Sequence, residues 1–106
     1  MIVKFEKEYL SELYYTGKCN DKKHRYQPHI VKNYIKRIIT LNETNKIEDL
    51  YSIHSLNYEI LQGDKKGISS IRINDQYRLE FKISIDSEKE PTITICTIKD
   101  ITNHYK

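Results

Sequence analysis

The sequence predicts an α+β domain in which a short N-terminal strand and helices pack on one face of a mainly antiparallel sheet. In the first half of the 106-residue chain, apolar side chains recur at helical spacing. From residue 54 onward, the apolar period changes from about 3.6 residues to about two, which is typical of strands. Turns of hairpin length separate these strands. We therefore expect antiparallel pairing that leaves one face of the sheet for the helices.

The chain begins with elements that are expected to be short. Residues 2–6 alternate between apolar and polar side chains and predict a strand. Residues 7–15 place apolar side chains at helical spacing, and Gly17 stands where a helix would end. Residues 18–27 are polar and basic, and we expect them to form a loop.

The clearest helix opens at Pro28, a residue that favours the first turn. An apolar stripe marks it as far as Leu41. Residues 42–45 break the pattern, and residues 47–51 predict one further helical turn. The stripe consists of Ile30, Val31, Tyr34, Ile35, Ile38, Ile39 and Leu41.

Four strands are expected in the second half of the chain, because apolar and polar residues alternate there. Their expected ranges are 56–60, 70–73, 77–85 and 92–98. The connecting segments are a glycine-bracketed turn at 63–67, the polar loop 74–76 and a turn through Pro91 at 86–91. No repeat or Pro/Gly/Ser-rich linker interrupts the chain, so we expect a single domain over residues 1–106.

The hairpin around residues 74–76 has one register that suits its apolar pattern. A three-residue loop pairs Ile73 with Tyr77 and Arg72 with Arg78. That register gathers the apolar residues of both strands on one buried face, whereas a two-residue loop would divide them between two faces. The face comprises Ile71, Ile73, Tyr77, Leu79 and Phe81.

The same register sets two arginines opposite each other, which is unfavourable unless a negative charge offsets them. Arg72 and Arg78 could together grip a phosphate, because each guanidinium group binds a phosphate in bidentate fashion. Alternatively, both side chains extend into water beside Glu80. The residues alone leave both interpretations open.

Composition places the chain among globular domains, with 38% hydrophobic and 31% charged residues. No apolar run approaches the ~18 residues of a membrane span, no signal peptide is evident at the start, and two cysteines are too few for a disulfide framework. We expect a reduced, cytoplasmic protein without a membrane partner. The spacing of Cys19, His24 and His29 suits a closed zinc site poorly, so neither a metal nor a cofactor is expected.

The net charge of +3 is small, but positive charge is concentrated in residues 18–37. This segment carries seven Lys or Arg residues against Asp21 alone. Such a block attracts phosphate backbones, although an ordinary solvated helix face behind a basic loop has the same composition. The turn at 63–67 adds Lys65 and Lys66, and His104 near the chain end is either solvated or a candidate general acid or base.

One stretch carries a family resemblance. Residues 61–81, LQGDKKGISSIRINDQYRLEF, resemble the RelE/ParE superfamily of bacterial toxins, and its HigB-like branch most closely. That branch has a run of the type L-K-G-D-x-x-G-x-x-S-I-x-V-x-x-x-[WY]-R-I-x-F and a short acidic tail with Tyr and His. Asp100 to Tyr105 is similar to that tail. The match is good over residues 54–106, and upstream it is limited to the order of elements.

The resemblance implies a small α+β toxin that enters the ribosomal A site and cuts mRNA without a metal, by attack of the 2′-hydroxyl on the adjacent phosphate. Arg78 matches the arginine after the aromatic position, which would grip the scissile phosphate, and His104 matches the tail histidine, a general acid or base. Arg72 and Lys65 fall on positions that are often basic, and Tyr77 falls on the aromatic one.

The chain departs from the HigB-like pattern at two positions. Glu59 stands where a His is frequent, and Gln62 stands where a Lys is frequent. The chemistry would then rest more heavily on Arg78, Lys65 and His104, with Glu59 as a candidate base. The alternatives are a gyrase-inhibiting toxin of the ParE type, a non-cleaving relative of the family, and an inert basic domain.

The resemblance also implies partners. A cognate antitoxin with a helix-turn-helix domain would neutralise the toxin, and operator DNA would be reached only through that antitoxin. The ribosome and mRNA would be contacted by phosphate attraction rather than base reading. The residues expected to make these contacts are Lys22, Lys23, Arg25, Lys32, Lys36, Arg37 and Lys66.

Overall fold

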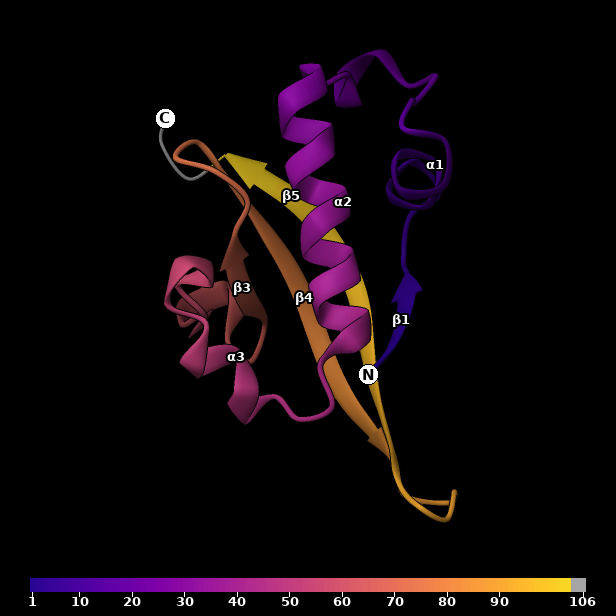
Figure 1. The fold of residues 1–106 in the computed structure, drawn as a ribbon, viewed down its shortest axis with the longest axis vertical. Helices are drawn as coiled ribbons and strands as arrows, with labels where there is room; N and C mark the ends of the chain where they lie inside the picture. Colours follow the sequence, from indigo (N-terminus) through magenta and orange to yellow (C-terminus); the bar gives the residue numbers. More distant parts are fainter. Residues whose placement is uncertain (104–106) are drawn as a thin grey trace.

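A computed structural model describes residues 1–103 of the chain, and Figure 1 shows its arrangement. A five-stranded sheet has the strand order β1-β5-β4-β3-β2. The strand β1 runs parallel to β5, and every other pair of neighbours is antiparallel. The α+β class and the mainly antiparallel sheet are therefore confirmed. The strands are β1 (Ile2–Phe5), β2 (Glu59–Ile60), β3 (Ser69–Arg72), β4 (Tyr77–Asp86) and β5 (Ile93–Asn103).

The helices lie on one face of the sheet, where α2 runs along its length with α1 beside it (Figure 1). Gly17 ends α1 in the left-handed conformation, and Pro28 begins α2, as the sequence predicts. The α-helices are α1 (Glu8–Thr16), α2 (Pro28–Glu43) and α3 (Glu48–Ser52). Short 3-10 turns are η1 (Lys22–His24), η2 (His54–Leu56) and η3 (Gly63–Lys65). No helix in residues 1–103 is long and apolar enough to cross a membrane.

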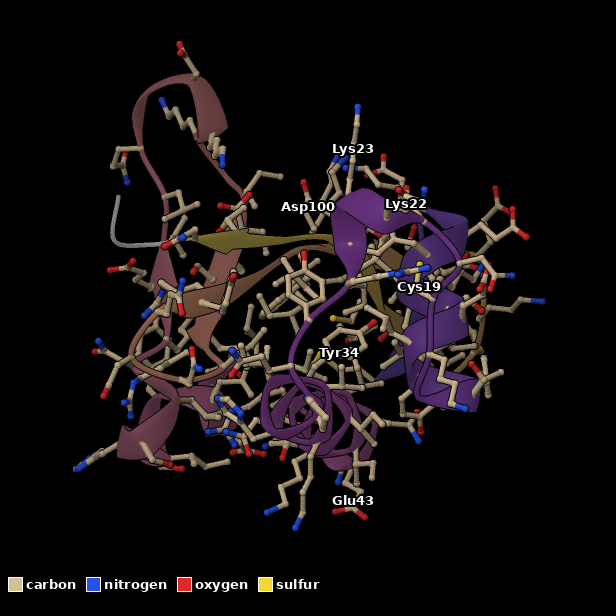
Figure 2. All side chains as sticks on the ribbon, turned by 90° about the horizontal axis from the view of Figure 1, so that it is seen from above. Cys19, Lys22, Lys23, Tyr34, Glu43 and Asp100 are labelled. Carbon is tan, nitrogen blue, oxygen red and sulfur yellow. The ribbon has the colours of Figure 1, made fainter. Side chains whose placement is uncertain are left out.

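The core forms where the apolar stripe of α2 meets the inward face of β3, β4 and β5, except for Ile39, which is 41% exposed. Tyr34 is fully buried and points from α2 into this interior (Figure 2), where its hydroxyl donates a hydrogen bond to the Leu10 carbonyl of α1 at 2.7 Å. This bond ties the two helices together above the sheet. The expected apolar face of the hairpin is buried as well, with Tyr77 half-buried at its margin.

The predicted hairpin register is confirmed. Arg72 lies opposite Arg78 in the pairing of β3 with β4, and the Ile73 amide donates to the Tyr77 carbonyl at 2.9 Å across the three-residue loop. The apolar alternation selects this register, because a shift by one residue would turn the buried side chains of one strand to the opposite face.

Two predicted strands differ from those observed. Asn57 adopts a left-handed backbone with φ of 48° and breaks the extended run expected at 56–60, so only Glu59 and Ile60 pair as a strand. The last strand continues five residues past Ile98 to Asn103. A bulge in β5 opposite Glu80 inserts one residue and interrupts the apolar alternation. The alternation in the sequence therefore does not predict that the strand continues beyond Ile98.

We expect Tyr34→Phe to lower the free energy of unfolding by about 1 kcal/mol, because it deletes one buried hydrogen bond and keeps the ring. Thermal melts of the purified chain measure the effect. The control Tyr15→Phe changes a hydroxyl on a side chain that is 73% exposed and leaves the melting temperature unchanged. Equal stability of the two variants would contradict the account of the helix pair.

Candidate functional site

The candidate site is built on the face of the sheet opposite the helices and on the outer edge of β3. Ile71 and Leu79 point into the core, so their neighbours along β3 and β4 face the other side. Those neighbours are polar yet buried: Ser70 is 1% exposed, Arg78 6% and Glu80 8%. Such burial requires partners for each polar group, and the partners identify the site.

The Arg78 side chain binds across the edge of the sheet. Its Nε donates to the Ser70 hydroxyl at 2.7 Å, and its Nη2 donates to the carbonyls of Asn57 and Ser70 at 2.7 and 3.1 Å. The left-handed conformation of Asn57 ends η2 and accompanies this carbonyl contact. The guanidinium group therefore holds the segment before β2 against the β3–β4 hairpin.

Glu59 supplies a carboxylate next to this buried cation. Its Oε1 lies 3.7 Å from Arg78 Nη2, while the Glu59 side chain is 49% exposed. The carboxylate thus offsets the Arg78 charge and remains open to solvent. The residue that replaces the frequent histidine of the HigB-like pattern therefore lies directly at the site.

Lys65 enters the site from the glycine-bracketed turn. Its ammonium nitrogen lies 2.9 Å from Glu80 Oε2, which also accepts a hydrogen bond from the Thr102 hydroxyl at 3.2 Å. The Glu80 side chain is only 10% exposed, whereas Lys65 is 53% exposed. A buried carboxylate therefore fixes a cation whose outer side faces solvent.

The two arginines that the register sets opposite each other take different partners. Arg78 turns to Ser70 and Asn57, whereas Arg72 forms an ion pair with Asp75 in the exposed hairpin loop. Neither of the two interpretations drawn from the sequence describes this arrangement in full, because Arg78 is buried rather than extended into water.

The remaining predicted catalytic positions lie at the end of the sheet. Tyr77 is half-buried and packs edge-on against Tyr26, with ring centroids 5.3 Å apart. Its strand partner is Asn103, the last described residue. His104 lies outside the described residues. The chain leading to it runs beside Arg78, whose partner in β5 is Thr102.

The cations expected to contact RNA come from separate elements. Lys23 points outward from η1 (Figure 2), and Lys66 belongs to the distant turn after η3. Other members surround a groove of about 810 Å³ between α1, α2 and the loop that joins them. The groove has apolar walls as well as cations: its lining includes Leu13, Tyr26, Val31, Ile35, Lys18, Arg25, Lys32 and Lys36.

Cys19, His24 and His29 do not gather around a common point. His24 stacks on the ring of Tyr9 at 3.6 Å and pairs with Asp21. In residues 1–103, no three His, Cys, Asp or Glu side chains are arranged to hold a metal ion.

Sequence reasoning missed three contributors to this region. The Asn57 carbonyl accepts a hydrogen bond from Arg78 because Asn57 adopts a left-handed backbone conformation, which the apolar pattern of the sequence does not predict. Glu80 was considered only as a charge that offsets the arginines, although it positions Lys65. Arg37 was assigned to the basic helix face, but its Nε donates to the Arg72 carbonyl at 2.7 Å, 35 residues away.

Asp100 anchors the far side of this sheet end to α1. Its carboxylate accepts hydrogen bonds from the Tyr9 hydroxyl and from Lys7. Burial raises the pKa of Asp100, but the hydrogen bonds from Tyr9 and Lys7 and the Lys7 charge outweigh that effect and hold the pKa below its usual value of 3.8. Burial and the nearby Asp100 charge raise the pKa of Tyr26 to about 12, so Tyr26 is neutral at physiological pH.

The fold and site define a class of protein: a small α+β domain whose sheet carries fixed cations on the face opposite the helices. A solved structure described as a YoeB/ParE toxin from Agrobacterium tumefaciens shares this fold, with a TM-score of 0.55 and 16% sequence identity over 99% of this chain and 100% of that one. The likeness is one of fold.

The family model for the HigB-like toxin, described as a RelE-like toxin of the type II toxin-antitoxin system HigB, matches residues 3–91. The chain is also 34% identical to Toxin HigB-1 of Vibrio cholerae serotype O1 over 83 residues, which is 77% of this chain and 83% of that protein. The chain belongs to the HigB-like family of type II toxins, and the expected family is confirmed. Membership implies a cognate antitoxin.

We expect Arg78→Ala to lower the free energy of unfolding by about 3 kcal/mol, because it removes three hydrogen bonds to buried or half-buried acceptors. Denaturant titration measures the loss. The control Arg25→Ala removes the same charge from an exposed side chain and costs less than about 0.5 kcal/mol. An Arg78→Ala chain as stable as the control would show that Arg78 does not hold the outer edge of the sheet together.

Stability should also depend on Asp100 in one pH range. Because the pKa of Asp100 is lower in the folded chain than its usual value of 3.8, the Asp100 carboxylate stabilises the fold at pH values above 3.8. This stabilisation is lost as the pH falls below 3.8 and through the lower pKa of the folded chain. Asp100→Asn should therefore lower the melting temperature at pH 7, and the difference from wild type should shrink as the pH falls below 3.8. Asp64→Asn, which removes an exposed carboxylate, is the control at the same pH values. A difference that stays constant to pH 2 would refute the assignment.

Proposed function

We propose that this chain is a ribosome-dependent mRNA endonuclease that acts in the cytoplasm without a metal. HigB-like toxins of the RelE family are generally endoribonucleases. The observation that carries the proposal is that Lys65 and Arg78, on the sheet face opposite the helices, are each held in place by their own partners. Preorganised positive charge of this kind stabilises the charge that develops on a phosphate during transfer.

The reaction is attack of a ribose 2′-oxygen on the adjacent phosphorus atom, with departure of the 5′-oxygen of the next nucleotide. The 2′-hydroxyl proton passes to a base, and a proton reaches the leaving 5′-oxygen from an acid. The products carry a 2′,3′-cyclic phosphate and a 5′-hydroxyl. No atom changes its oxidation state, and the step needs basic, acidic and cationic side chains only.

The role that we assign to each cation follows from the exposure of its side chain. Arg78 is 7% exposed at its side chain and contributes a fixed positive charge from beneath the site. Lys65, half exposed and held by Glu80, is placed to contact the scissile phosphate directly. Arg72, 39% exposed, is a second contact for the RNA backbone, and Tyr77 borders the site at the strand end.

Two groups are candidates for proton transfer. Glu59 offers an open carboxylate beside Arg78, and its exposure lets it reach a substrate hydroxyl. His104 is the candidate that the family pattern offers at the chain end. We assign the base to Glu59 and the acid to His104.

The distribution of the other cations supports two kinds of contact. Lys22, Lys23 and Lys66 are exposed, and we assign them to ribosomal RNA phosphates. Arg25, Lys32 and Lys36, which were expected to bind RNA as well, line the groove with apolar walls. That combination also suits an acidic amphipathic segment of the antitoxin, so antitoxin binding would cover cations that attract RNA. We propose a helix-turn-helix antitoxin, which would link the toxin indirectly to operator DNA.

Induction of the chain in a bacterial host, followed by mapping of transcript 5′ ends, tests the nuclease function. We expect cuts within translated codons and at least a tenfold loss of cutting in Lys65→Met, Glu59→Gln and His104→Ala. Lys89→Gln, in the exposed β4–β5 loop at the opposite end of the sheet, is the matched control (Figure 1).

Two outcomes would refute this function. Growth arrest with intact transcripts and damaged DNA would replace it with gyrase inhibition. Normal growth and intact transcripts on induction of a folded chain would identify a non-cleaving relative. Arg78→Ala is unsuitable as the sole test, because its expected loss of stability lowers activity for a second reason.

A further inference from the structure

Arg37 reaches from α2 to the outer edge of β3. The strand β2 pairs only with Ser69 and Ser70. The Ile73 amide donates a hydrogen bond to Tyr77 of β4, and the backbone groups of successive residues point to opposite edges of a strand. The amide and carbonyl of Arg72 therefore point away from β4, at a position that β2 does not reach. Arg37 Nε donates to this Arg72 carbonyl at 2.7 Å, so the half-buried guanidinium group is held by a backbone atom.

The rest of the Arg37 guanidinium group is available for a ligand. Within residues 1–103, the Nη groups of Arg37 form no hydrogen bond or ion pair, and no carboxylate pairs with this side chain. An anchored guanidinium group with its fork open needs little reorganisation to bind an oxyanion.

A second cation lies close to this fork. Burial lowers the pKa of Arg37, and the Arg72 charge lowers it further, so the two like charges repel each other. The partner of Arg72 is Asp75, whose side chain is 95% exposed in the hairpin loop. Two arginines held together in this way favour an anion between them.

We propose that Arg37 and Arg72 form a binding seat for a phosphodiester group of a polynucleotide backbone. The seat adjoins the cleavage site, because Arg37 and Arg78 bind carbonyls only two residues apart on β3, about 7 Å along the strand. It would hold a phosphate that flanks the scissile one. This inference deepens the proposed function, since it names a subsite for the same RNA.

The seat is testable by binding alone. The probes are a 12-nucleotide RNA with 2′-O-methyl riboses, which lacks the attacking hydroxyl, and purified ribosomes. Arg37→Gln should weaken binding to at least one probe about tenfold, the usual effect of losing one charge-assisted hydrogen bond. With the single-stranded probe, the slope of log affinity against log salt should fall by about 0.7.

Arg72→Gln separates the seat from a structural role of Arg37. It removes the second charge but leaves the backbone carbonyl that anchors Arg37, so it should weaken binding in the same way while the melting temperature is retained. Lys89→Gln, on the opposite end of the sheet, removes one charge as the matched control and should change affinity less than twofold.

The outcomes distinguish the seat from the nuclease. An effect on the oligonucleotide supports a seat for the mRNA phosphate that flanks the scissile one. An effect only on ribosomes would place the seat on ribosomal RNA and overturn its assignment to the substrate. If Arg37→Gln and Arg72→Gln stay within twofold of Lys89→Gln on both probes, or if wild type binds neither probe, the seat is refuted, whatever the cleavage assay shows. If both variants lose binding and wild type leaves transcripts intact, the seat stands and the nuclease function fails.

Discussion

The outer edge of the sheet depends on the interaction of Arg78 with Ser70 and Asn57. One guanidinium group satisfies a side-chain hydroxyl and two backbone carbonyls from segments that are 8 and 21 residues away. Because β2 contributes only two residues to the sheet, the ladder alone holds the 54–60 segment weakly. Arg78 makes the position of Glu59 definite, and it places a positive charge beneath a polar surface.

The burial of Arg78 separates its role from that of the other cations at this end of the sheet. Arg78 is nearly enclosed, and part of its binding capacity goes into holding the edge together. Lys65, Arg72 and Arg37 stand nearer to solvent, each oriented by a different contact: a buried carboxylate, a loop carboxylate and a backbone carbonyl. Groups fixed in advance lose little entropy when a phosphate binds, which is the condition for electrostatic catalysis.

The parts of the fold that follow from local patterns could be predicted from the sequence. The apolar alternation around residues 74–76 determines the register that sets Arg72 opposite Arg78, and Pro28 with its apolar stripe marks α2. The bulge opposite Glu80 and the left-handed Asn57 could not be predicted, because each interrupts a period without a distinctive residue.

The candidate site was predicted only as a set of charged residues. Where each side chain goes depends on contacts between distant segments: Arg37 binds a carbonyl 35 residues away, and Lys65 binds a carboxylate 15 residues away. The sequence therefore indicated which residues carry charge near the hairpin. It did not indicate that Arg78 would be buried while Lys65 and Arg72 remain open.

The end groups of RNA cut on translating ribosomes by the purified chain test the central claim most directly. Attack by the 2′-hydroxyl, assisted only by side chains, predicts 2′,3′-cyclic phosphate on the upstream fragment and a 5′-hydroxyl on the downstream one. Fragments with 5′-phosphate ends would show that water or a metal-bound hydroxide attacks instead, and uncut mRNA would contradict the nuclease function altogether.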